Sequence, residues 1–169
     1  LEAGDSLLSF FVDNKAELFR QTAQHLKLTL VALGIAIGLG LPLGIIIQRY
    51  QLVRGPILGF TSLLQTIPSL ALLGFLLQLV GIGFWPSIIA LFLYALLPIV
   101  QNTFTGLEEV DQAVVDAARG MGMTGSQRLM RIELPLALPT IFAGIRTAAV
   151  INVGIATLCA LIGGGGLGA

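Results

Sequence analysis

The chain has 169 residues, of which 56% are hydrophobic and 11% are charged, and its nine basic and nine acidic residues cancel. Soluble domains are about 25% charged, so this chain has too little polar surface to cover a core in water, and its expected solvent is lipid. The balanced charge argues against nucleic acid as a partner, and a single cysteine, Cys159, excludes an internal disulfide.

The first 27 residues are expected to form an amphipathic segment that lies at the membrane interface. Its acidic residues and its lack of a basic start argue against a cleavable signal peptide. Because the chain begins with Leu1 and stops inside a glycine-rich run, we interpret it as a fragment of a longer protein. The apolar residues of this segment are Leu7, Leu8, Phe10, Phe11, Leu18 and Phe19.

Four membrane-spanning helices are predicted after this segment. A helix of about 20 residues covers about 30 Å, the thickness of the hydrocarbon layer. Residues 55–107 carry no charge, a length that suits two spans, and the glycines, proline and aromatic pair at 81–86 predict the turn between them. The predicted spans are 28–48, 57–80, 86–106 and 138–161.

Proline and glycine punctuate these spans. Proline inside a helix removes a hydrogen bond and is expected to kink the helix, whereas glycines four residues apart let two helices approach closely. The general abundance of glycine in membrane helices is the alternative explanation for such pairs. The prolines are Pro42, Pro68 and Pro98, and the glycine pairs are Gly34/Gly38 and Gly40/Gly44.

The basic residues near the span ends predict the orientation of the chain in the membrane. Four spans alternate in direction, so loop 49–56 and segment 108–135 share one side, which holds five arginines against three basic residues before the first span. Because basic residues favour the cytoplasmic side, segment 108–135 is expected in the cytoplasm and the N-terminus outside.

Segment 108–135 is predicted to form two short amphipathic helices pinned to the membrane surface. Gly120 and Gly122 should end the first helix, because glycine adopts the left-handed conformation that closes a helix. Thr124, followed three residues later by Gln127, is typical of a capped helix start. Pro135 is expected to mark re-entry into the last span. From periodicity alone, an ordinary connecting loop fits equally well. The apolar stripe of the first helix is Val110, Val114, Ala117, Ala118 and Met121.

The spacing within this segment resembles the EAA loop of binding-protein-dependent ABC importer permeases. That loop has the pattern Glu-Ala-Ala, three residues, Gly, nine residues, Ile, one residue, Leu-Pro. The chain departs from the pattern only at its first position, where Asp116 replaces Glu and keeps the charge on a shorter side chain. The matching residues are Asp116, Ala117, Ala118, Gly122, Ile132, Leu134 and Pro135.

The resemblance implies an all-α, polytopic transmembrane helix bundle of the type I ABC importer permease kind, with about four spans present and a final span missing. Residues 28–169 would form the transmembrane domain, and residues 108–135 its coupling loop. In that family the loop docks into a groove on a cytoplasmic ATPase subunit. ATP-driven closure of two ATPases then switches the pore between inward and outward access.

The resemblance also implies partners and the roles of the loop residues. ATP and Mg²⁺ would bind to the ATPase subunits, and this chain would bind no cofactor. A second permease subunit, identical or different, and a solute-binding protein or fused solute-binding domain would complete the importer in the cell membrane of a prokaryote. In the loop, Ala117, Ala118 and Met121 would form a slim apolar contact face and Gly122 a tight turn. Asp116 and Arg119 at the rim would set its register.

Other segments resemble one branch of these permeases, which transports glycine betaine, carnitine and choline. The resemblance therefore implies a compatible solute as the substrate. A permease for another small polar solute, such as methionine, remains the alternative because it would share the architecture. The resembling segments are 64–71, 92–103, 143–146 and 163–168.

Polar side chains inside the spans are candidates for the translocation path, because such residues usually face the interior of a bundle. Hydrogen bonding between helices, worth about 0.6 kcal/mol each, is the alternative role. For the one charged candidate, Arg146, the alternative is extension toward the headgroups. The candidates are Gln65, Thr66, Pro68, Ser69, Asn102, Thr103, Arg146 and Asn152.

An intramembrane enzyme is the alternative from another class, and the sequence argues against it. His25 is the only histidine and the spans contain no acidic residue, so neither a catalytic site nor a metal site is expected. The glycine-rich end, 163–168, fits a dinucleotide-binding pattern only by spacing, without the strand–helix context or the Lys-Ser/Thr end of a phosphate loop. A passive channel would not need the spacing of segment 108–135.

Overall fold

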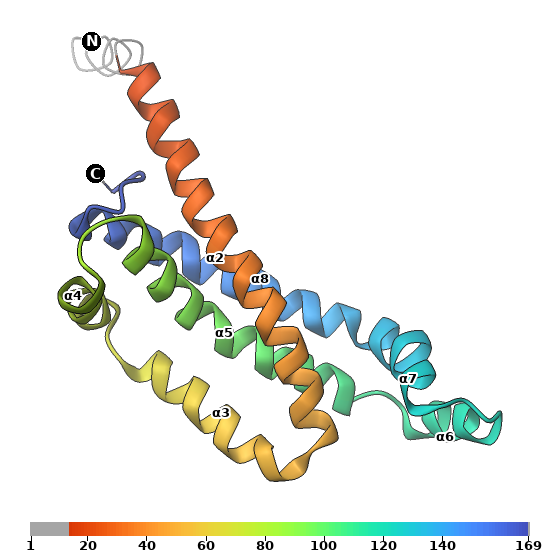
Figure 1. Cartoon of the computed structure of the whole chain (residues 1–169). Helices are drawn as coiled ribbons and strands as arrows, with labels where there is room; N and C mark the ends of the chain where they lie inside the picture. The colour runs from red at the N-terminus through yellow and green to blue at the C-terminus, as the bar shows by residue number, and fades with distance from the viewer. Residues whose placement is uncertain (1–13, 169) are drawn as a thin grey trace, which may run out of the picture.

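The computed structural model describes residues 14–168, and this part of the chain consists of helices joined by short turns, which confirms the all-α prediction (Figure 1). The helices are α2 (Lys15–Arg49), α3 (Gln51–Thr66), α4 (Ser69–Val80), α5 (Phe84–Glu108), α6 (Gln112–Gly120), α7 (Gly125–Arg128), the π-helix η1 (Leu129–Glu133), α8 (Leu134–Leu158) and the 3-10 helix η2 (Cys159–Ile162).

Three helical stretches are long and apolar enough to cross a membrane: α2, α5 and the run from α7 to η2. Helices α3 and α4 add a fourth crossing if they form one broken span. The predicted number of spans therefore agrees with the structure. The α6–α7 region lies at the end of the bundle away from the described ends of the chain (Figure 1).

Helix α5 forms the centre of the bundle, and α2 and α8 pack against it. Small residues allow this close approach: a Cβ atom added at Gly40 would lie 2.7 Å from Ile99 Cγ2, and one at Gly44 would lie 2.5 Å from Thr103 Cβ. The other predicted pair, Gly34/Gly38, has no such neighbour within 4 Å. Of the two predicted glycine pairs, Gly40/Gly44 is therefore the one that lies in the contact between α2 and α5.

The predicted span 57–80 consists of two helices, α3 and α4, rather than one kinked helix. The chain turns by 96° between α3 and α4. Ile67 is extended, with φ −71° and ψ 126°, as the residue before a proline prefers. Pro68 cannot donate a backbone hydrogen bond and its ring would collide with the preceding turn, so the kink expected at this residue becomes a complete break.

The predicted turn between the second and third spans is confirmed. Helix α4 ends at Val80, Gly81 and Gly83 have positive φ angles of 93° and 120°, and α5 starts at Phe84. The Gly83 N–H donates to the Ile162 carbonyl (2.9 Å), which joins this turn to the end of the last span.

The predicted interfacial segment lies partly outside the described residues, which begin at Asn14. Residues 15–27 form the first turns of α2 and continue without a break into the first span. Phe19 is exposed and Leu18 is half-buried. Location of these turns at the membrane interface stays a prediction.

Candidate functional site

Segment 108–135 contains the first predicted helix and the predicted start of the second. Helix α6 begins after Asp111, whose carboxylate accepts a hydrogen bond from the Ala113 N–H (2.9 Å). It ends at Gly120, and Gly122 adopts the left-handed conformation with φ 79°. The predicted capping box is present: the Thr124 hydroxyl accepts from the Gln127 N–H (3.4 Å), and Gln127 Oε1 accepts from the Thr124 N–H (2.9 Å).

The second helix differs from the prediction because it is not a separate surface helix. Helix α7, the π-turn η1 and α8 follow one another without a break, and Pro135 and Pro139 lie inside this run. In η1 the hydrogen bonds reach back five residues, as from the Leu134 N–H to the Leu129 carbonyl. Because Pro135 falls at the start of the new helical register, its missing N–H does not interrupt the run. Re-entry into the membrane at Pro135 stays a prediction.

The apolar residues of α6 divide between two faces. Val115 and Ala118 are buried against the rest of the chain, whereas Val114 is 41% and Met121 73% exposed, and Ala117 is exposed as well. The prediction that Ala118 belongs to the outer contact face is therefore wrong. Successive residues of a helix are about 100° apart around its axis. The buried side of α6 is therefore rotated away from the apolar stripe that was predicted. The exposed apolar face is Val114, Ala117 and Met121.

The remaining motif residues take different positions around this face. Asp116 and Arg119 form an exposed ion pair, with Oδ1 and Nη1 3.0 Å apart. Ile132 and Leu134 are half-buried and Pro135 is exposed. Leu134 packs beside a buried cluster of Leu107, Ala137 and Ile141, which fixes the start of α8 against α5.

A charge cluster around the buried Glu133, at the base of the segment, was not predicted from the sequence. The Glu133 side chain is only 7% exposed, and its carboxylate accepts a hydrogen bond from Arg128 Nε (2.9 Å). Arg49, at the end of α2, lies 3.9 Å from the same carboxylate. One signal was present in the sequence, because Glu133 is the only acidic residue after Asp116.

Gln65, a candidate for the translocation path, is hydrogen-bonded to a neighbouring helix. Pro98 has no N–H, so the Tyr94 carbonyl four residues earlier lacks its usual helical donor. Gln65 Nε2 donates to this carbonyl (2.9 Å), and the Tyr94 hydroxyl donates to the Ile67 carbonyl in the α3–α4 break. This reciprocal pair supports the interhelical role for Gln65.

The other uncharged candidates are spread over α3, α4, α5 and α8. Thr66, Asn102 and Thr103 each donate to a carbonyl three or four residues earlier in their own helix. At the break, Pro68 is exposed and Ser69 is half-buried. Asn152 on α8 is fully buried, and neither polar atom of its amide has a protein partner. In the described part of the chain, no hydrogen bond joins one of these candidates to another.

Residues 36–169 match the family of binding-protein-dependent transport system inner membrane components. The match begins inside α2 and covers the helices from α3 to α8, including segment 108–135. The chain belongs to this family. It is therefore a multi-pass inner-membrane permease of the ABC importer class, a kind of subunit that is not itself catalytic.

Individual relatives agree with this assignment to the permeases. The glycine betaine/carnitine/choline transport system permease protein OpuCB of Bacillus subtilis is 42% identical over 97% of this chain and 76% of its own length. The osmoprotectant import permease protein OsmW of Salmonella typhimurium is 48% identical over 95% of this chain and 77% of its own length. In structure, the chain resembles the inward-facing MetNI methionine ABC transporter, with a TM-score of 0.76, 26% identity, and coverage of 89% of this chain and 76% of that one.

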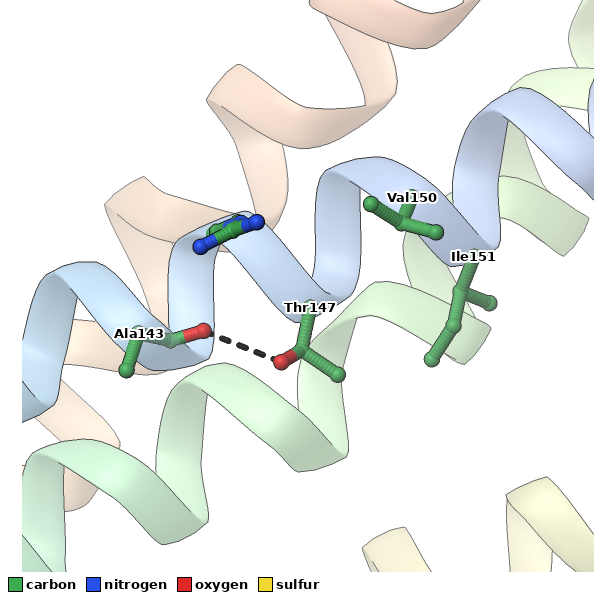
Figure 2. Close-up of a pocket in the computed structure, with 5 residues that line it drawn as sticks. Ala143, Thr147, Val150 and Ile151 are labelled. Atoms are coloured by element: carbon green, nitrogen blue, oxygen red, sulfur yellow. Dashed lines mark hydrogen bonds between the residues drawn. The ribbon is translucent and has the colours of Figure 1, made fainter.

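Arg146 is an unusual residue for a spanning helix of this permease. It is exposed on α8 and has no ion pair among the described residues. It lines a groove of about 390 Å³ with Ala143, Thr147, Val150 and Ile151, in which the Thr147 hydroxyl donates to the Ala143 carbonyl at 3.0 Å (Figure 2). A charged side chain at the bilayer centre costs about 2.5–3.5 kcal/mol, so the Arg146 guanidinium needs water, another protein subunit or the lipid headgroups around it.

Proposed function

We propose that this permease is the membrane subunit of an ATP-driven importer for compatible solutes of the glycine betaine, carnitine and choline type. The names of the relatives support this substrate class. The likeness to the methionine transporter is lower in identity and lies in the fold, so methionine is the weaker candidate.

Residues 108–135 act as the coupling loop that receives the movement of a cytoplasmic ATPase. The observation that carries this role is the exposed apolar face of Val114, Ala117 and Met121 on a capped helix. Monomeric proteins seldom leave such a face in water without a partner. The Asp116–Arg119 pair at its edge would set the register of the contact.

The complete importer has several further parts. ATP and Mg²⁺ bind to the ATPase subunits, which dock on the coupling loop in the cytoplasm. A second permease subunit, identical or different, pairs with this one, and a solute-binding protein or fused domain delivers the solute from outside. The N-terminus lies outside, with residues 1–27 at the membrane interface and residues 28–169 as the transmembrane domain.

Arg146 is the main candidate for the translocation path, because an exposed guanidinium in a spanning helix needs a polar environment. Ser69 and Asn152 are the uncharged candidates. Gln65, Thr66, Asn102 and Thr103 shape the helices around the path, since their side chains donate to backbone carbonyls.

The coupling role is tested with Val114→Asp in the complete transporter, reconstituted in vesicles with its ATPase and binding protein. A charge on the exposed apolar face should weaken ATPase binding about tenfold or more and abolish solute uptake, because the carboxylate would have to be desolvated on docking. Vesicles containing the unmodified transporter should take up glycine betaine, carnitine or choline. Uptake of methionine alone would overturn the substrate class.

The matched control is Leu52→Asp, which also places a charge at an exposed apolar residue. Leu52 is 95% exposed in the first turn of α3, where an acidic residue is favoured. This variant should bind the ATPase and transport normally. If Val114→Asp also binds the ATPase and imports solute like the unmodified protein, the loop is not the coupling contact.

A further inference from the structure

The Glu133 carboxylate lies where three segments of the permease meet. It follows α7, it stands at the last position of η1 before α8, and it faces Arg49 at the end of α2. Arg128 Nε binds one carboxylate oxygen at 2.9 Å, and Arg49 lies 3.9 Å from the other. Arg49 also donates to the Gly125 carbonyl at 2.9 Å. One arginine of the first span therefore contacts both ends of the α7–η1 segment.

The arginine contacts are the direct polar link between the first span and the loop. Among the described residues, the hydrogen bond from Arg49 to Gly125 is the one that joins α2 to segment 108–135. Beside α6 the contact is incomplete: a cavity of about 150 Å³ lies there, and Arg49, Arg128 and Glu133 line it together with Gln48 and Gln112. Gln48 Oε1 is buried without a protein partner.

Glu133 and Arg128 differ from the exposed ion pairs because their side chains are only 7% and 15% exposed, whereas the Arg49 side chain reaches them from the surface and is 32% exposed. Exposed pairs such as Arg54–Glu108 and Asp116–Arg119 are screened by water and hold geometry weakly. A buried carboxylate is tolerated only when its partners keep their positions, so it favours one arrangement of the segments that supply them. Here the segments are the end of the first span and the coupling loop.

We propose that Glu133, through Arg128 and Arg49, is a positioning residue that ties the coupling loop to α2, so that movement of the loop displaces the first span together with the last one. Helix α8 follows the loop through its continuous backbone, whereas α2 follows it through this charge cluster. The inference rests on the coupling role proposed for the loop.

The test uses Arg49→Gln and Glu133→Gln in the complete transporter with its ATPase and binding protein. Arg49→Gln leaves the Glu133–Arg128 pair intact, so the loop retains its fold even if Glu133→Gln does not. The number of solutes imported per ATP hydrolysed should fall about tenfold in Arg49→Gln, while the ATPase remains bound. Glu17→Gln, which breaks the exposed Glu17–Arg20 pair elsewhere on α2, is the matched control and should transport normally.

A distance measurement shows whether Arg49→Gln separates α2 from the loop or only lowers the stability of the permease. Spin labels at Tyr50→Cys and Ser126→Cys, both exposed positions, report the separation of α2 and α7, with one labelled permease per transporter. The separation should stay constant between the resting and ATP-bound states in the unmodified protein, and should change or broaden in Arg49→Gln.

Two results would overturn the proposal. One is an unchanged ratio of import to hydrolysis in both variants, and the other is a Tyr50–Ser126 distance that behaves alike with and without Arg49. Failure of the underlying coupling role would look different, because Val114→Asp would then leave the ATPase bound and import unaffected.

Discussion

At the residue scale, Gln65 and Tyr94 join α3 and α5 at the points where Pro68 and Pro98 remove backbone hydrogen bonds. Pro98 deprives the Tyr94 carbonyl of its helical donor, and Gln65 replaces that donor from α3. The Tyr94 hydroxyl in turn reaches the Ile67 carbonyl next to Pro68. Both prolines and both polar residues are visible in the sequence. Their pairing depends on the 96° turn between α3 and α4, so the sequence alone could not predict it.

Substitution Gln65→Leu should lower the free energy of unfolding by about 1–3 kcal/mol, because the Tyr94 carbonyl would be left buried without a donor. The double variant Gln65→Leu/Pro98→Ala should recover most of this loss, since the alanine N–H supplies the missing helical hydrogen bond. Denaturant unfolding of the permease in detergent measures both effects. Equal stability of the single and double variants would contradict the explanation.

At the element scale, the capped turn between α6 and α7 was predicted well and the buried face of α6 was not. Helix ends depend on local residues, such as Gly122, Thr124 and Gln127, so their pattern is visible in the sequence. The face that a short helix buries depends on what lies beneath it. Val115 is buried and Met121 exposed because the packing partner lies to one side of the predicted stripe.

The turn gives a prediction that separates backbone conformation from available space. Neither Gly120 nor Gly122 has an atom within 4 Å of an added Cβ, but only Gly122 has a positive φ. Gly122→Ala should cost about 1–2 kcal/mol in the turn and reduce import per ATP, whereas Gly120→Ala should be neutral or slightly stabilising. Uptake and ATP hydrolysis in reconstituted vesicles measure this difference. Equal effects of the two substitutions would show that the left-handed turn does not matter.

At the scale of the whole molecule, hydropathy predicted the number of spans but not their shapes. Apolar length determines whether a segment can cross the membrane, so the crossings and the turn at 81–86 could be predicted. Hydropathy carries no information on the direction in which a helix runs. It therefore predicted neither the complete break in the second span nor the continuous run from α7 into α8. The Glu133 cluster escaped for a similar reason, because Arg49 and Glu133 are far apart in the chain.

The orientation of the molecule can be checked with one added cysteine. Cys159 is fully buried, so labelling from either side of the membrane should have a low background. Met121→Cys, at a position that is 73% exposed, should react with a membrane-impermeant maleimide only in inside-out vesicles when the ATPase is absent. Reaction in right-side-out vesicles would place the coupling loop outside. Bound ATPase should protect the new cysteine.

The π-turn η1 gives the motif spacing a geometric meaning. Nine residues separate Gly122 from Ile132, and η1 starts within that interval, at Leu129. A π-turn holds one residue more than an ordinary helical turn, so removing a single residue there would restore the α-helix and rotate α7 by about 100° around the axis of α8. The exposed face of α6 would then point in another direction. The interval therefore sets an angle as well as a length, and a change of one residue would turn the exposed face of α6 away from the partner proposed for it.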